Sequence, residues 1–270
     1  MSLRLLGRGM TYLALCAAAY VSIFPFYWLM VGATNTTADI IRGKAGYGSA
    51  LWDNVSKLFT QVDMPRIFWN STELAVVATA LTLLVSSLAG YGFEIFRNRI
   101  SERAFAVLLS MLSIPFAAIM VPLFVLMAQL HLINTYAAVI LPGIASIFII
   151  FYFRQSTKAF PSELRDAGRL DGLKEWQIFA YIYVPVMRST YAAATIIVFM
   201  ANWNNYLWPL IVLQTNENKT VTLVVASLAS AYYPDFGVVM VATTLATLPT
   251  LIIFFVLQRQ FVEGLLGSVK

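Results

Sequence analysis

The amino-acid sequence predicts an all-α integral membrane protein with six transmembrane helices. Its 270 residues are 60% hydrophobic and only 11% charged, with a mean hydropathy of +0.76, whereas about a quarter of the residues in soluble domains are charged. The apolar residues gather into long uncharged runs, and a membrane-spanning helix requires about 20 consecutive apolar residues. Composition and run length together exclude a soluble protein.

The uncharged runs set the expected spans. The run from Ala104 to Phe153 is too long for one helix and is expected to hold two, with a break near residues 131–134. The first run follows basic residues as a signal peptide does, but it continues to Val31, which predicts an uncleaved anchor. Within one transmembrane domain, residues 1–270, we expect spans near residues 10–32, 72–96, 105–129, 136–156, 188–213 and 237–258.

The basic residues predict the orientation of the chain. If the N-terminus and the C-terminus are cytoplasmic, all but five of the eighteen Lys and Arg residues lie in inner segments, as the positive-inside rule requires. Topology thus explains the net charge of +5, and we expect contacts with anionic membrane lipid but no nucleic-acid partner. Glu94, at the inner end of the second expected span, has Arg97 and Arg99 nearby as partners.

The expected spans contain no succession of Asp, Glu or His residues. Ion-driven pumps and channels with charged rings depend on such residues, so both classes are disfavoured. His131, the single histidine, is expected in a short outer loop without a second metal ligand nearby. We therefore predict neither a metal site nor a catalytic residue.

The most charged stretch is the cytoplasmic loop at residues 158–187. Ser162 is expected to cap one short helix in this loop, and Asp171, which precedes Gly172, is expected to cap a second. Small residues at helical spacing would make one face of the first helix thin enough for another backbone to approach. A loop that only faces water would show the same pattern. The face in question carries Leu164, Ala167 and Gly168.

The stretch from Pro161 to Pro185 resembles the EAA loop of ABC-importer permease subunits, whose pattern is P-x-E-L-x-E-A-A-x-x-D-G-A followed at a distance by a proline. It departs from that pattern at Asp166, Gly168 and Leu173. The resemblance implies a coupling helix that docks on the ATP-hydrolysing subunit. The residues implied in coupling to the ATPase are Glu163, Leu164, Asp166, Ala167, Gly168, Asp171, Gly172 and Pro185.

A group of amide and aromatic side chains lies near the end of the fifth expected span. A sugar presents hydroxyl groups at its rim and C–H groups on its faces, so amides and flat rings suit it. An aromatic belt at the membrane interface would have the same composition, and position alone leaves both interpretations open. The candidate substrate-pathway residues are Asn202, Trp203, Asn204, Asn205, Tyr206 and Trp208.

Helical geometry predicts how these residues are directed. Asn202 and Tyr206 would share a face, whereas Asn204 and Asn205 would point about 100° apart, so one of that adjacent pair should matter more. The segment WNNYLWP, residues 203–209, also resembles the fifth span of carbohydrate-uptake ABC permeases. That resemblance favours a lining role over an aromatic belt.

Segments along the whole chain resemble the same family of binding-protein-dependent importers, most closely the G-type subunits of maltose permeases; the last is QRQFVEG at residues 258–264. The resemblance implies a type I ABC importer permease fold, uptake of a sugar or sugar-like solute, and a bacterial or archaeal cytoplasmic membrane. The implied partners are a second homologous permease in a heterodimer, two ATP-binding subunits and an extracytoplasmic solute-binding protein.

The sequence contains no G-x-x-x-x-G-K-[ST] phosphate-binding loop. We therefore expect no cofactor on this chain, which is not predicted to be an enzyme, and we expect ATP and Mg²⁺ on the partner ATPase subunits. The short pattern Gly90-Tyr91-Gly92 is typical of close helix packing. An ATP-independent secondary carrier is the alternative; it predicts internal repeats and a discontinuous helix with an ion site. A purely structural membrane protein would have no use for the amide-rich span or the charged loop.

Overall fold

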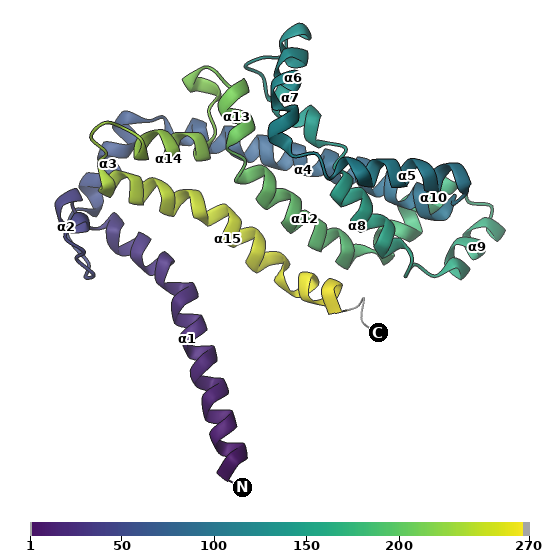
Figure 1. Cartoon of the computed structure of the whole chain (residues 1–270), viewed down its shortest axis with the longest axis horizontal. Helices are drawn as coiled ribbons and strands as arrows, with labels where there is room; N and C mark the ends of the chain where they lie inside the picture. Colours follow the sequence, from purple (N-terminus) through teal and green to yellow (C-terminus); the bar gives the residue numbers. More distant parts are fainter. Residues whose placement is uncertain (1, 267–270) are drawn as a thin grey trace. The chain divides into compact units, whose positions relative to one another are not determined.

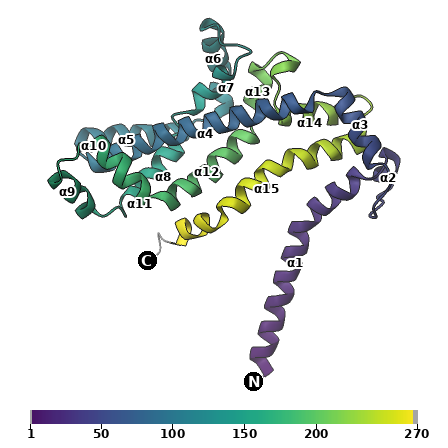
Figure 2. The same ribbon diagram turned by 180° about the vertical axis from the view of Figure 1, so that it is seen from behind.

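The computed structural model describes the backbone of residues 2–266 and the side chains of residues 8–259. All regular secondary structure in this described part of the chain is helical (Figures 1 and 2). The predicted all-α fold class is therefore confirmed.

Three helices are long and unbroken, and each contains a stretch that is long and apolar enough to cross a membrane. They are α1 (Ser2–Ala33), α4 (Met64–Ile95) and α15 (Phe236–Leu266). Three further candidate spans are pairs of helical segments that bend at a short break, which gives three to six spans by length and composition. The bends are 100° between α5 (Arg99–Met111) and α6 (Phe116–Gln129), 43° between Tyr136–Gly143 and Ile147–Thr157, and 81° between Glu175–Val186 and Arg188–Val212.

The bent segments are made of shorter elements. A proline lies in or close to each break, at Pro115, Pro142 and Pro185. Proline interrupts helices because it lacks an N–H group and displaces the preceding residue from helical geometry. Each of the six expected ranges overlaps one of these candidates, but the fifth candidate begins at Glu175, well before the expected range 188–213, and the span boundaries stay a prediction. The elements are α7 (Tyr136–Ile140), η1 (Leu141–Gly143), α8 (Ile147–Thr157), α10 (Glu175–Ile178), η2 (Phe179–Tyr183), α11 (Val184–Val186), α12 (Arg188–Trp203) and α13 (Leu207–Val212).

The chain forms two compact units. In the first, a buried asparagine on α3 (Leu51–Gln61), Asn54, donates from Nδ2 to the carbonyls of Ala33 and Asn35, both at 2.9 Å. Gly237 leaves room for this amide, since a Cβ there would lie 2.6 Å from the Asn54 Nδ2. This unit comprises residues 2–65 and Val224–Leu248, with α1, α2 (Thr37–Ile41), α3 (Leu51–Gln61), most of α14 (Val221–Ala229) and the first part of α15.

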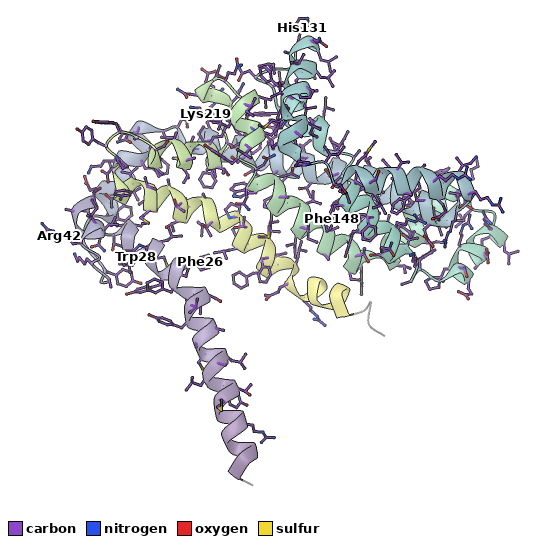
Figure 3. All side chains as sticks on the ribbon, in the orientation of Figure 1. Phe26, Trp28, Arg42, His131, Phe148 and Lys219 are labelled. Carbon is purple, nitrogen blue, oxygen red and sulfur yellow. The ribbon has the colours of Figure 1, made fainter. Side chains whose placement is uncertain are left out.

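Much of α1 is exposed along its length. All side chains from residue 8 to residue 27 are exposed, and Figure 3 shows Phe26 and Trp28 projecting from this helix. An exposed apolar helix of this length suits contact with lipid rather than with water.

The second unit contains both regions for which a function is predicted. Three buried apolar clusters hold it together, centred on Trp208 and Val212, on Tyr91 and Tyr183, and on Phe153. The unit comprises Arg66–Leu223 and residues 249–266, with most of α4, all elements from α5 to α13 including α9 (Ser162–Leu170), and η3 (Asn216–Asn218).

Within this unit, α4 and α8 approach each other closely at Gly90. A Cβ at Gly90 would lie 2.6 Å from the Phe153 Cβ and 2.8 Å from the Arg154 backbone nitrogen. A Cβ at Gly92 would meet no atom within 4 Å. The close helix packing predicted for this glycine pair is therefore confirmed at Gly90 and does not extend to Gly92.

Beside this crossing, a buried arginine joins three helices. Arg154 on α8 donates from Nε to the Glu94 carboxylate on α4 at 3.2 Å and pairs with Glu102 on α5. Its guanidinium also lies 4.0 Å from the centre of the Phe105 ring. The expected pairing of Glu94 with the neighbouring arginines is wrong, because Arg97 pairs instead with Glu102 at 2.7 Å.

Candidate functional site

The coupling loop, which we define as Pro161–Pro185, begins with α9. Pro161 occupies the N-cap position and Ser162 is the first helical residue, so the predicted Ser162 cap is wrong. Asp171 closes this helix as its C-cap and does not start a second one, because α10 begins at Glu175 after Lys174. The sequence correctly predicted two short helices but placed the start of each helix at the wrong residue.

Gly172 makes the turn between the two helices possible. Its φ of +81° is left-handed, a conformation that favours glycine. The Leu173 amide donates to the Gly168 carbonyl at 2.9 Å and the Gly172 amide donates to the Arg169 carbonyl at 3.0 Å. This pair of bonds is the Schellman pattern that ends helices.

The residues of α9 divide between two faces. Gly168 is buried, and a Cβ there would lie 2.8 Å from Ile182 Cδ1 and 3.2 Å from Ile178 Cγ1. The expectation that Gly168 belongs to an open face with Leu164 and Ala167 is therefore wrong. The exposed residues of the predicted coupling set are Glu163, Leu164, Asp166, Ala167, Asp171, Gly172 and Pro185, and Leu170, which was not predicted, is 90% exposed.

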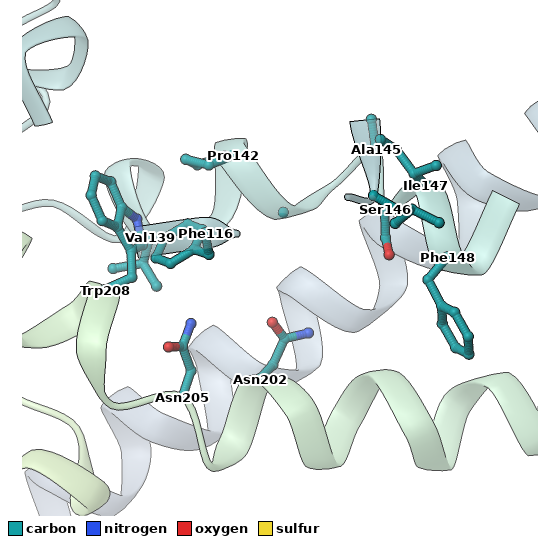
Figure 4. Close-up of a pocket in the computed structure, with 12 residues that line it drawn as sticks. Phe116, Val139, Pro142, Ala145, Ser146, Ile147, Phe148, Asn202, Asn205 and Trp208 are labelled. Carbon is teal, nitrogen blue, oxygen red and sulfur yellow. The ribbon is translucent and has the colours of Figure 1, made fainter. Parts of the chain in front are cut away.

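The second region is a cavity of about 430 Å³ that contains two of the predicted asparagines. Figure 4 shows Asn202 and Asn205 extending toward the segment that joins η1 to α8, with Trp208 to one side. We call this site the amide cavity. It is lined by Leu112, Phe116, Val139, Pro142, Gly143, Ala145, Ser146, Ile147, Phe148, Asn202, Asn205 and Trp208.

A second break in the fifth candidate span, between α12 and α13, lies beside the cavity. Helix α12 ends at Trp203 and α13 begins at Leu207, so the residues between them do not follow helical spacing. Asn205 lies three residues after Asn202, a spacing that helical geometry also brings together, and both asparagines line the cavity. The prediction that Tyr206 shares a helix face with Asn202 is wrong, because Tyr206 stands at the N-cap of α13 and is exposed.

The polar groups of the cavity differ in how many hydrogen bonds they make within the protein. Trp208 donates from Nε1 to the Ala138 carbonyl at 2.8 Å, which fixes the indole, and Phe116 packs edge-on against it at 5.9 Å. Asn202 Nδ2 lies 3.5 Å from Thr79 Oγ1, a long hydrogen bond. The described side chains provide no hydrogen-bond partner for the Asn205 amide. This amide is therefore available to a bound solute.

The other three predicted pathway residues lie outside the cavity lining. Trp203 is buried and stacks on Phe199 with ring centres 5.8 Å apart. Asn204 is exposed and donates from Nδ2 to the Met200 carbonyl at 2.8 Å, which caps α12. Reasoning from the sequence missed the opposite wall, where Pro142, Gly143 and Ser146 mark the break between η1 and α8.

The metal-ligating residue types do not gather in the described part of the chain. Among the residues searched, no group of three or more His, Cys, Asp or Glu side chains is placed to hold a metal ion. His131 stands at the far end of α6 (Figure 3), in a turn where its φ is +56°.

An all-helical fold with several apolar segments, a cavity between broken helices and a charged loop with an exposed helix, all seen in the described residues, are typical of a membrane-embedded transport protein. The chain belongs to the family described as binding-protein-dependent transport system inner membrane component, whose sequence model matches residues 82–266. The matched segment contains the coupling loop and the amide cavity.

Individual relatives agree with this assignment. The lactose transport system permease protein LacG of Rhizobium radiobacter is 67% identical over 96% of this chain and 95% of its own length. The arabinooligosaccharides transport system permease protein AraQ of Halalkalibacterium halodurans is 34% identical over 93% and 92%. Among solved structures, a bacterial ABC transporter that imports the acidic polysaccharide alginate matches 97% of this chain and 98% of its own, with a TM-score of 0.78 at 17% identity, which shows a shared fold.

Family and fold establish the class of the protein. The chain is a multi-pass inner membrane permease subunit of an ABC importer, and it is not itself an enzyme. Membership of this family implies ATPase and solute-binding partners. The resemblance to carbohydrate-type permeases is confirmed, and a secondary carrier is not favoured.

Proposed function

We propose that this chain forms half of the transmembrane pathway of an ATP-driven importer for a neutral disaccharide such as lactose. The observation that carries the proposal is the amide cavity, which presents the Asn205 amide and the exposed rings of Phe116 and Phe148 and has no charged residue in its lining. The relative that is 67% identical is named for lactose transport.

The chemistry of the cavity favours a neutral solute. An amide both donates and accepts hydrogen bonds, as a sugar hydroxyl does, and an aromatic face packs against the C–H groups of a sugar ring. An anionic solute would lose its hydration without gaining a cationic partner, which costs several kcal/mol in a poorly solvated site. The cavity therefore suits uncharged saccharides.

The complete pathway requires a partner permease, since we place only half of it on this chain. The proposed complex is a heterodimer of this chain with a homologous permease, two ATP-binding subunits that hold ATP and Mg²⁺, and an extracytoplasmic solute-binding protein. We place the N-terminus, the C-terminus and the coupling loop in the cytoplasm of a bacterium or an archaeon, because most basic residues then lie on the inner side.

The exposed face of α9 supports a docking role for the coupling loop. Glu163 and Asp166 offer negative charge, and Leu170 offers an apolar side chain that is 90% exposed. Docking on an ATP-binding subunit would cover this leucine. Closure of the two ATP-binding subunits would then move α9, and the movement would change which side of the membrane has access to the amide cavity.

The experiment compares two adjacent asparagines in the reconstituted complex. Asn205→Ala removes an amide from the cavity, and Asn204→Ala, the matched control, removes an exposed amide that caps α12. A lost hydrogen bond to a polar ligand costs about 1 to 3 kcal/mol, roughly a 5- to 150-fold effect. At equal amounts of assembled complex, we expect Asn205→Ala to reduce lactose uptake by about fivefold or more and Asn204→Ala to leave it near wild type.

A competition measurement tests the preference for neutral solutes. Lactobionate carries a carboxylate where lactose has a neutral end, so excess lactobionate should leave uptake of radiolabelled lactose unchanged. Equal uptake by the two alanine variants, or efficient competition by lactobionate, would contradict the proposed role of the cavity.

A further inference from the structure

Glu175, on α10, is contacted by side chains from two other helices. Its Oε1 accepts hydrogen bonds from Arg165 Nη2 at 3.1 Å and from Arg169 Nε at 2.8 Å. Its Oε2 accepts from Arg165 Nε at 3.3 Å and from the hydroxyl of Tyr91 on α4, also at 3.3 Å. One carboxylate therefore joins the coupling helix α9 to α4.

The two arginines are placed for this contact by the face of α9 on which they lie. Arg165 and Arg169 are four residues apart and flank the buried Gly168, so they share the face turned toward α10. The Arg165 side chain is only 15% exposed, and its guanidinium lies 5.4 Å from the centre of the Phe96 ring, which directly follows α4. This inner face belongs to the permease itself, and the outer face remains open to a partner.

Tyr91, the residue of α4 that Glu175 contacts, is held firmly by its neighbours. Its side chain is buried, with ring centres 5.2 Å from Phe179 and 4.8 Å from Tyr183. One turn further along α4, Glu94 pairs with Arg154 of α8. A displacement of Tyr91 therefore acts on a helix end that is already bound to its neighbours.

We propose that Glu175 is the positioning residue that transmits movement of α9 to α4 during the ATP-driven cycle. The inference rests on the proposed function, because it requires an ATP-binding subunit docked on the outer face of α9. Bonds between ionised groups are roughly twice as strong as neutral ones, so the carboxylate keeps α9 attached when the docked subunit moves. Without it, α9 keeps the packing of Gly168 against Ile178 and Ile182, which is apolar and non-directional.

The test uses the full complex in proteoliposomes, and solute-binding protein loaded with lactose is added to the vesicles. Radiolabelled lactose uptake and ATP hydrolysis are measured in the same vesicles. Glu175→Gln should lower the lactose transported per ATP hydrolysed by about fivefold or more, the lower end of typical coupling between sites, while hydrolysis continues. Asp53→Asn is the control, since it removes one carboxylate from an exposed ion pair with Lys57 on α3 and should leave the ratio unchanged.

Tyr91→Phe tests the contact between Glu175 and α4. It removes only the hydroxyl and retains the ring packing, so the ratio should fall in the same direction by a smaller factor. The double variant should be no worse than Glu175→Gln alone, because both substitutions remove the same connection. If Glu175→Gln prevents assembly, Tyr91→Phe carries the test by itself.

Two failures are distinguishable. A wild-type complex whose ATP hydrolysis does not respond to loaded binding protein would refute the proposed function and the inference with it. A coupled wild type in which both variants transport lactose at the wild-type ratio would refute the inference alone. That result would mean that Glu175 has only a structural role and affects only the amount of assembled complex.

Discussion

Replacing Gly90 with alanine is expected to push α4 and α8 apart. The added Cβ would lie 2.6 Å from the Phe153 Cβ, 2.8 Å from the Arg154 backbone nitrogen and 3.0 Å from the Ile150 carbonyl oxygen. Two of these atoms belong to the backbone and the third is bonded directly to it. No change of rotamer relieves the overlap, so the helices themselves must move.

The magnitude follows from this geometry. Ordinary contact begins at 3.4 Å, so the closest pair must separate by roughly 0.8 Å in a region that packs like other protein interiors. Overpacking of this kind costs about 1 to 3 kcal/mol, and alanine returns up to about 1 kcal/mol through its better helix propensity. We expect a net loss of about 1 to 2 kcal/mol in the free energy of unfolding.

Gly92→Ala is the matched control. It makes the same substitution two residues away, where an added Cβ meets no atom within 4 Å, so it should be neutral or slightly stabilising. The assay is the temperature at which half of the purified complex in detergent is lost from its size-exclusion peak. Gly90→Ala should lower that temperature and Gly92→Ala should not. Equal temperatures for the two variants would refute the close crossing at Gly90.

Two further predictions concern a turn and a carboxylate. Gly172 has a left-handed φ of +81° with open space around it. Gly172→Val should therefore reduce uptake more than Gly172→Asn, because a left-handed conformation costs about 1 to 2 kcal/mol for ordinary residues and asparagine tolerates it better; equal uptake by the two variants would contradict this reason. For Asp235, burial opposes the charge, but hydrogen bonds from Thr37 and the Val238 amide and the charge of Lys57 outweigh it and lower the pKa of the carboxyl. A lowered pKa gives stability that is complete above the unfolded value of about 3.9 and is lost as pH falls through the folded pKa. Asp235→Asn should therefore destabilise the complex at about pH 7, with the deficit shrinking toward about pH 3; a deficit that does not depend on pH would show that the ionised carboxylate contributes nothing.

The candidate spans could be predicted from the sequence because crossing a bilayer requires a long run of apolar residues. An apolar run of sufficient length has no stable alternative to a helix in lipid, where every backbone polar group must be satisfied internally. The charged loop stood out in an apolar chain, and its resemblance to the EAA loop carried the prediction of a coupling role. Neither conclusion required knowledge of which residues touch.

The helix breaks were less predictable. Pro115, Pro142 and Pro185 are visible in the sequence, yet prolines also occur inside unbroken helices of this chain, at Pro25 and Pro249. A proline weakens a helix locally, and tertiary packing decides whether the helix ends there. The break after Trp203, which leaves Tyr206 at the N-cap of α13, depends on that packing.

The sequence by itself determined that this protein is helical, that it is embedded in a membrane and that it carries a charged loop that resembles the EAA loop of ABC importers. Only the tertiary structure decided that Gly168 faces its own chain, that Arg154 is the partner of Glu94, and that one carboxylate at Glu175 joins α9 to α4. The physical reason is separation along the chain. Glu94 and Arg154 are 60 residues apart, and Tyr91 and Glu175 are 84 apart, so these contacts exist only once the helices between them have packed.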